Sequence, residues 1–162
     1  MGKRKAEVFV YGTLKRGHGL HYALSEAQYL GDYIVQGEMY NVGAFPALVP
    51  TTDHTRFVHG ELYLVDMDTL AHLDAVEGTP NLYRRKTVMP VPCELADNGR
   101  RVQYIGSLES PYAGQCEVYV FNRPTTNMPL IPATSSVDVE GRTVFISSWG
   151  SQHKPKRKAE VK

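Results

Sequence analysis

Apolar and polar positions follow each other along this chain with the spacings of β-strands and, in two segments, of α-helices. The clearest alternation runs from Phe57 to Val65 and predicts a strand. The run from Val8 to Tyr11 has the β-branched and aromatic residues of a buried strand, and it stops at Gly12. We expect further strands at Tyr33–Val42, Tyr83–Val91, Val102–Ile105, Cys116–Phe121 and Arg142–Ser147, with an irregular loop at Asn122–Val137.

Two segments have helical spacing. The first runs from Leu20 to Tyr29 and should end at Gly31. The second follows Asp66, whose side chain can cap a helix, and Gly78 with Pro80 should end it. Its expected apolar face consists of Met67, Leu70, Leu73 and Val76.

Many short strands with two modest helices predict an α+β fold. The regular helical crossovers of a doubly wound parallel sheet are missing from the pattern. Gly37 lies inside an expected strand, where glycine often marks a bulge or the bend of a barrel. We therefore expect a small, curled mixed β-barrel flanked by two or more short helices.

Composition limits the possible classes of protein. The 162 residues fit one domain, which we place at residues 6–150, and 42% of them are hydrophobic. No apolar run approaches the roughly 20 residues that a membrane span requires, and the basic N-terminus does not continue as a signal peptide. Two distant cysteines make no disulfide framework, so we expect a cytoplasmic protein.

The formal net charge of +1 conceals an uneven distribution. Residues 1–5 and 154–162 hold eight of the 18 basic residues and one of the 17 acidic ones, which leaves about −6 for the rest of the chain. A body of that sign does not favour nucleic-acid binding. We expect residues 1–5 and 151–162 to be basic, disordered tails; a nuclear or nucleic-acid address is the alternative.

The first expected strand ends in residues 11–17, Tyr-Gly-Thr-Leu-Lys-Arg-Gly, which we call the glycine loop. A strand that turns at a glycine into a polar loop leaves backbone N–H groups without partners. Such groups can hold an anion or the oxygen of a polarised carbonyl. Thr13 could also act as a nucleophile, but no base is implied beside it, and a backbone role is the better interpretation.

Glu77 stands out because it lies at the C-terminal end of the second expected helix. The helix dipole is negative there and opposes a carboxylate by roughly 0.3–1 kcal/mol when it is exposed. Like polarity and partial burial both raise a carboxyl pKa, the direction that suits a general base near neutral pH. The alternative is an exposed glutamate before a glycine cap, and Asp74 is the competing carboxylate, for which we favour a structural or solvent-facing role.

Other catalytic signatures are absent from the sequence. It contains no G-x-S-x-G elbow, no Walker loop and no dinucleotide fingerprint. None of the six histidines forms a metal-ligand pair with a carboxylate or cysteine, so we predict no metal and no cofactor. His18 and His21 lie close to the glycine loop, and the alternatives for them are solvated side chains or a ligand or acid–base role.

Four segments together resemble the γ-glutamylcyclotransferase-like superfamily, closest to the branch of γ-glutamylamine cyclotransferase and the butirosin-processing enzyme. They are residues 11–17, residues 43–47 (Gly-Ala-Phe-Pro-Ala), residues 58–63 (Val-His-Gly-Glu-Leu-Tyr), and residues 73–78 (Leu-Asp-Ala-Val-Glu-Gly) followed by Tyr-Arg-Arg at 83–85. The order and spacing match from about Val8 to Val91. The segment Asn122–Val137 departs from the family's shorter pattern, which leaves the outer wall of the pocket, and the accepted leaving group, open.

The resemblance implies a small β-barrel with helices, a pocket at the glycine loop and a small-molecule γ-glutamyl substrate. By this likeness Tyr11, Gly12, Thr13 and Leu14 hold the γ-glutamyl group through backbone N–H groups. Glu77 matches the acid–base glutamate, and Tyr119 matches a tyrosine that some members place against the substrate. The implied reaction is an intramolecular attack of the α-amine on the γ-carbonyl, which releases 5-oxoproline and a free amine.

Two other readings stay open. A binding module could keep this fold and pocket without turnover, and the basic ends could serve a nucleic-acid-associated protein. The sequence specifies neither the leaving amine nor the oligomeric state.

Overall fold

The computed structural model describes residues 4–97, 101–106 and 115–150. The expected tails lie outside the described residues except for Arg4 and Lys5, and Lys5 opens the first strand. The elements are β1 (Lys5–Val10), the 3₁₀ helix η1 (His21–Leu24), β2 (Gln28–Gln36), β3 (Glu38–Asn41), β4 (Pro46–Val49), β5 (Arg56–Asp66), α1 (Met67–Val76), β6 (Tyr83–Val88), β7 (Val91–Ala96), β8 (Arg101–Ile105), β9 (Cys116–Phe121), β10 (Ser135–Val139) and β11 (Arg142–Ser147). The α+β class is confirmed.

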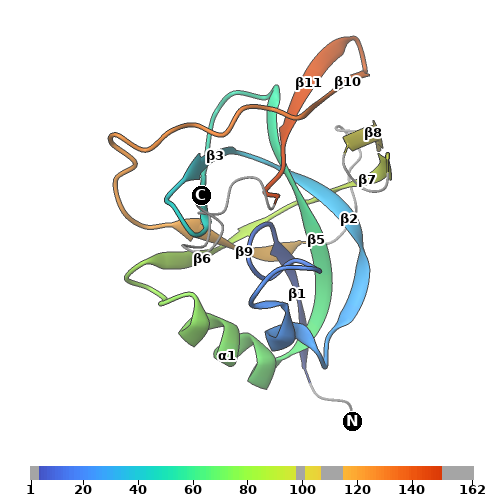
Figure 1. Cartoon of the computed structure of the whole chain (residues 1–162). Helices are drawn as coiled ribbons and strands as arrows, with labels where there is room; N and C mark the ends of the chain where they lie inside the picture. Colours follow the sequence, from blue (N-terminus) through green and yellow to red (C-terminus); the bar gives the residue numbers. More distant parts are fainter. Residues whose placement is uncertain (1–3, 98–100, 107–114, 151–162) are drawn as a thin grey trace, which may run out of the picture.

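Strand β5 organises the main sheet (Figure 1). Along one edge it pairs with β2 in antiparallel fashion. Its other edge is divided, because β1 pairs with residues 61–66 and β11 runs parallel to residues 56–58. From β1 the sheet continues through the parallel neighbour β9 to β6, and from β2 it continues through β7 to β8.

The predicted barrel is wrong. The sheet order β6-β9-β1-β5-β2-β7-β8 does not close on itself, and β10 with β11 forms a branch from β5. A barrel needs one continuous ring of strand neighbours. Here β1 and β11 pair with different parts of the same edge of β5. The strands beyond them therefore diverge, and the sheet does not close.

The first predicted helix is also largely wrong. Only the short η1 forms within Leu20–Tyr29, and Gln28 already belongs to β2. The register explains this change, because Gln28 pairs with Leu64 and Tyr29 pairs with Tyr63. Strand β2 supplies hydrogen-bond partners for the backbone N–H and C=O groups of residues 57–64 of β5. A helix at this position would leave these groups without partners.

The second helix forms as predicted. The Asp66 carboxylate accepts a hydrogen bond from the Thr69 amide at 2.7 Å, and α1 ends before Gly78. Leu70 and Leu73 are buried, but Met67, expected on the same face, is 45% exposed. Met67 is the first helical residue.

The other strand predictions hold in outline with shifted ends. Gly37 separates β2 from β3, so Tyr33–Val42 is two strands. Tyr83–Val91 contains β6 and only the first residue of β7. The segment Asn122–Val137 is irregular up to residue 134, but Ser135 begins β10, which pairs with β11.

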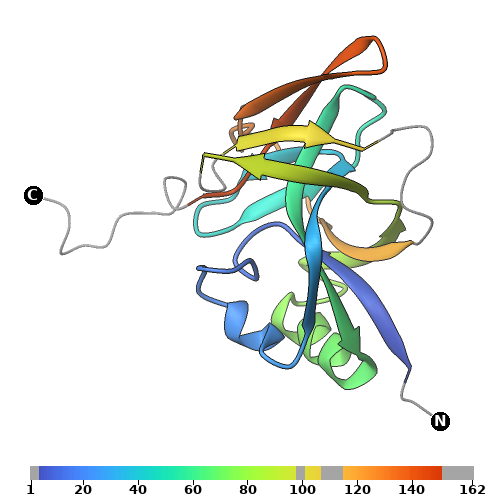
Figure 2. The ribbon, with the colours of Figure 1, turned by 90° about the vertical axis from the view of Figure 1, so that its right-hand side faces the viewer.

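Both helices lie at one end of the molecule, and the β10–β11 hairpin lies at the other (Figures 1 and 2). Leu70 and Leu73 of α1 share a core cluster with Leu24 of η1 and with Val8 and Val10 of β1. Within the described ranges, no helix has the length and apolar character needed to cross a membrane.

We predict that Gly60→Ala lowers the free energy of unfolding by about 2 kcal/mol or more. An added Cβ would clash with the Val10 carbonyl oxygen and lie 2.5 Å from Cζ of Phe9, where the end of β1 lies beside β5. Urea unfolding followed by circular dichroism measures the change. Gly19→Ala is the control, since its Cβ would meet no heavy atom within 4 Å. Equal stability of the two variants would contradict the prediction.

Candidate active site

All six residues predicted for the site line one narrow cleft at the helical end of the sheet. Its empty space is about 310 Å³, including the part that is open to solvent. The lining residues come from the end of β1 with its loop, from the segment before and at the start of β4, from the end of α1, from β6 and from β9: Phe9, Val10, Tyr11, Gly12, Thr13, Leu14, Phe45, Pro46, Glu77, Tyr83 and Tyr119.

Glu77 is the C-cap of α1 and the one carboxylate among these lining residues. Its amide donates to the Leu73 carbonyl at 2.9 Å, which holds its backbone in the last helical turn. Its side chain is half-buried, and burial raises its pKa to about 7. The expected direction of the pKa shift is therefore confirmed, with burial as the cause.

Gly12 allows the loop after β1 to approach the opposite wall closely. A Cβ at this position would lie 2.6 Å from Cγ of Pro46. The proline ring cannot move aside as a flexible side chain could. Only glycine therefore fits here without displacing the wall of the cleft.

The amides of Gly12, Thr13 and Leu14 make no hydrogen bond to any other described residue. Their carbonyls, in contrast, are all engaged. The Gly12 carbonyl accepts from the Lys15 amide at 3.0 Å, and that of Thr13 accepts from the Leu20 amide at 2.9 Å. Three successive N–H groups are thus uncommitted in the loop that faces Glu77 across the cleft, an arrangement that can hold anionic oxygen.

The side chain of Tyr11 is structural. Its buried hydroxyl donates to the Tyr119 carbonyl at 2.6 Å and accepts from the Leu48 amide at 3.1 Å. Burial, together with the nearby Tyr83 and Glu77, raises its pKa well above the ordinary value, although the Leu48 bond acts in the opposite direction. Any contact of Tyr11 with a ligand's polar groups must therefore come from its backbone.

Tyr119 lines the cleft, and its hydroxyl is also engaged, because it donates to Oδ1 of Asp74 at 2.7 Å. Nε of Arg85 lies 2.9 Å from the same oxygen. Asp74 thus has the structural role that we favoured for it. The role of Tyr119 toward a substrate stays a prediction.

Five lining residues were not predicted as site residues: Phe9, Val10, Phe45, Pro46 and Tyr83. Phe45 and Pro46 belong to the segment Gly-Ala-Phe-Pro-Ala, and Tyr83 opens β6. The Tyr83 hydroxyl donates to the Pro46 carbonyl at 2.6 Å, and its ring lies 6.1 Å from that of Phe45. The available signal was the aromatic residue in each motif, but no spacing rule links these segments to each other.

Among the residues that the structure describes, no group of three or more His, Cys, Asp and Glu side chains could hold a metal ion. His18 and His21 do not line the cleft. Nδ1 of His21 instead lies 2.9 Å from the Leu14 carbonyl, just behind the loop.

Comparisons with known proteins all point to one protein family. The family described as "Gamma-glutamyl cyclotransferase, AIG2-like" matches residues 8–136. "Gamma-glutamylcyclotransferase family protein YtfP" of Escherichia coli K12 is 30% identical over 132 residues, which cover 81% of this chain and 96% of that protein. Human "Gamma-glutamylaminecyclotransferase" is 34% identical over 151 residues, which cover 84% and 92%. The crystal structure of an AIG2-like protein from Mus musculus has a TM-score of 0.61 at 26% identity and covers 78% of this chain and 86% of its own.

We predict that Glu77 makes stability depend on pH. Its pKa of about 7 in the folded protein lies above the ordinary value of 4.5, so between these values the folded state binds more protons than the unfolded chain. The free energy of unfolding should therefore fall as the pH rises through this window. From pH 5 to pH 8, wild type should lose on the order of 1–3 kcal/mol more than Glu77→Gln, which cannot ionise.

Urea unfolding at a series of pH values measures this difference. Asp68→Asn, which removes an exposed carboxylate from the same helix, should follow the wild-type curve. Parallel curves for wild type and Glu77→Gln would show that the carboxyl titrates normally.

Proposed function

Because the chain belongs to the AIG2-like γ-glutamyl cyclotransferase family, we propose that it cyclises γ-glutamyl compounds to 5-oxoproline and a free amine. One observation carries the proposal. A half-buried carboxyl with a pKa of about 7 lines the same cleft as three uncommitted backbone amides. One group can move a proton, and the others can hold the oxygen on which negative charge develops.

The first step is proton transfer. The Glu77 carboxylate takes a proton from the α-ammonium group of the substrate, which is a weaker acid than a carboxyl group. A glutamate with a pKa near 7 is a stronger base than an ordinary glutamate, so the transfer costs less free energy. The free amine then attacks the γ-carbonyl carbon of the same molecule.

Ring closure places negative charge on the γ-carbonyl oxygen. The amides of Gly12, Thr13 and Leu14 supply the donors that stabilise this charge. Collapse of the intermediate breaks the bond to the leaving nitrogen, and protonated Glu77 returns its proton to that nitrogen. The ring nitrogen passes its second proton to the released amine, which leaves as an ammonium ion. One C–N bond forms, one breaks, and the Glu77 carboxylate is regenerated.

Both reacting groups belong to one molecule, so much of the rate can come from folding the substrate correctly. Well-oriented intramolecular reactions gain on the order of several kcal/mol over their bimolecular counterparts. The aromatic walls formed by Phe45, Tyr83 and Tyr119 restrict the shapes that a bound substrate can adopt. The human relative's name indicates γ-glutamylamines as a substrate class to test first.

We predict that wild type releases 5-oxoproline from γ-glutamyl amines and that Glu77→Gln loses at least about 10²-fold in kcat. The amide neither takes the proton nor returns it. Chromatography of 5-oxoproline measures turnover, and circular dichroism with thermal unfolding verifies the fold. Asp68→Asn, on the exposed side of α1, is the matched control and should keep wild-type activity.

Full turnover by Glu77→Gln would refute the role of this carboxyl. A wild-type protein that binds γ-glutamyl amines and dipeptides but converts none of them would instead be a binding module with the same pocket.

A further inference from the structure

The direction of the loop amides is set by the partners of the loop carbonyls. In a trans peptide the C=O and the N–H of one unit point in opposite directions. The bond from the Lys15 amide to the Gly12 carbonyl therefore orients the N–H of Thr13, and the bond from the Leu20 amide to the Thr13 carbonyl orients that of Leu14. These two bonds connect the loop only to itself and to the turn at Leu20, not to the rest of the fold.

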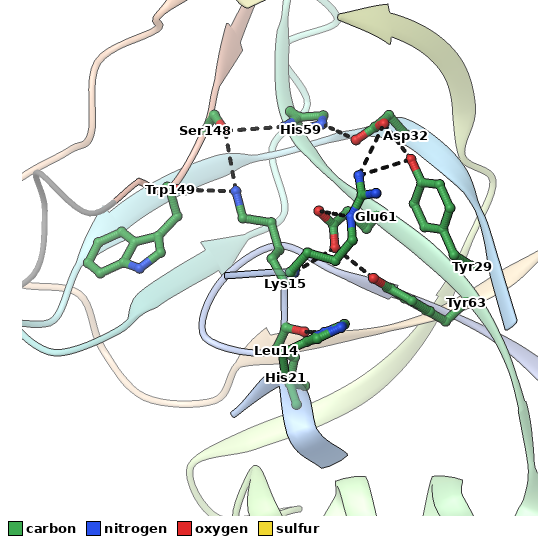
Figure 3. A network of polar contacts seen from close by, with 11 residues as sticks. Leu14, Lys15, His21, Tyr29, Asp32, His59, Glu61, Tyr63, Ser148 and Trp149 are labelled. Carbon is green, nitrogen blue, oxygen red and sulfur yellow. Dashed lines mark hydrogen bonds and ion pairs between the residues drawn. The ribbon is translucent and has the colours of Figure 1, made fainter. Parts of the chain in front are cut away.

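Two side chains from outside the loop hold its next peptide units. Nδ1 of His21 lies 2.9 Å from the Leu14 carbonyl, and because a carbonyl can only accept, this nitrogen carries the hydrogen. Oε1 of Glu61, on β5, accepts from the Arg16 amide at 2.9 Å, and Oε2 lies 3.4 Å from Nε of Arg16. Figure 3 shows His21 beside the Leu14 carbonyl and the Glu61 carboxylate with the Tyr63 hydroxyl directed toward it.

Glu61 is 6% exposed, and it is not among the residues that line the cleft. The buried Tyr63 hydroxyl donates to the same Oε1 at 2.9 Å. A buried carboxylate is expensive, and a well-packed apolar side chain would often give equal or greater stability. A charged group that binds a loop amide therefore points to a requirement other than stability.

The Lys15 side chain attaches the loop to the residues just after β11, the last strand that the structure describes. Its ammonium donates to the Trp149 carbonyl at 2.7 Å and contacts Oγ of Ser148 at 3.4 Å. Ser148 in turn contacts Nδ1 of His59, whose Nε2 lies 2.9 Å from Oδ1 of Asp32 (Figure 3). This partly buried network meets the Glu61 contact at Arg16, whose guanidinium lies 3.9 Å from Oδ2 of Asp32 and 3.4 Å from Oε2 of Glu61.

We propose that Glu61 and His21 are positioning residues that keep the Thr13 and Leu14 amides in place for the reaction. Their own contacts hold the peptide units that follow Leu14 and Lys15, and the Lys15 amide of the first unit binds the Gly12 carbonyl that orients the Thr13 N–H. The proposal rests on the proposed cyclotransferase function. Neither side chain touches the cleft; each acts through the loop backbone. Losing either contact should let the peptide units rotate and misplace the donors, with little change in the affinity for the rest of the substrate.

Kinetics of a variant series test the proposal. Glu61→Leu should lower kcat at least about ten-fold while KM changes by less than about three-fold, because the donors matter most when charge develops. Glu61→Gln keeps an acceptor for the Arg16 amide and should recover to within about three-fold of wild type. His21→Phe keeps a ring beside Tyr63 but loses the donor, and it should resemble Glu61→Leu.

Tyr63→Phe is the matched control. It removes the other hydrogen bond to Oε1 of Glu61 and leaves the bond to the loop in place. Its kcat should stay within about two-fold of wild type. A general loss of packing would affect this variant as well, whereas loss of positioning would not.

A second measurement needs no turnover. Heteronuclear {¹H}–¹⁵N NOE values of the Thr13 and Leu14 amides should fall in Glu61→Leu and His21→Phe, and stay at wild-type values in Tyr63→Phe. If wild type cyclises nothing, the proposed function fails, while these NOE values still decide whether the two side chains position the loop. Wild-type NOE values in both loop-contact variants, or wild-type kcat in folded Glu61→Leu, would overturn the proposal.

Discussion

One buried hydroxyl joins three of the segments that enclose the cleft. The Tyr11 phenol donates to the Tyr119 carbonyl of β9 and accepts from the Leu48 amide of β4, so both its hydrogen-bonding functions bind backbone. Tyr83 secures the Pro46 carbonyl in the same way. A buried phenol without partners would be costly, so these bonds allow few alternative arrangements of the walls. They hold the glycine loop, β4, β6 and β9 together around the cleft.

Two glutamates show how differently this fold treats one residue type. Glu61 is surrounded by donors, namely the Arg16 amide, the Arg16 guanidinium and the Tyr63 hydroxyl. Glu77 lies among the aromatic side chains of the cleft, and burial raises its pKa. The first environment holds a carboxylate still, and the second prepares a carboxyl for exchanging protons near neutral pH. In the reaction that we propose, Glu77 transfers the proton, and Glu61 supports the loop whose amides hold the oxygen of the intermediate.

Local patterns predicted much of this structure. Alternation located β5, the Asp66 cap located α1, and the position of Glu77 before Gly78 identified the carboxyl with a raised pKa. Local patterns do not show which strands pair. The length of β2 and the branching of the sheet at β5 depend on contacts between segments that are distant in the sequence. For this reason the helix at Leu20–Tyr29 and the barrel were wrongly expected. Alternation also does not reveal that both sides of β5 are covered. His59 and Glu61 are 5% and 6% exposed, and Glu61 accepts a hydrogen bond from the loop.

The bond between Lys15 and the Trp149 carbonyl has a consequence for the order of events during synthesis. The glycine loop and Glu77 leave the ribosome early, but β9, which lies beside β1, and Trp149 follow only near the end of the described chain. Contacts of such long sequence separation form late because loop closure must come first. A nascent chain can therefore carry every proton-transfer and oxyanion group of the proposed reaction before it holds them in working geometry. The chain could catalyse the proposed reaction only after β11, the last strand that the structure describes, has joined the sheet.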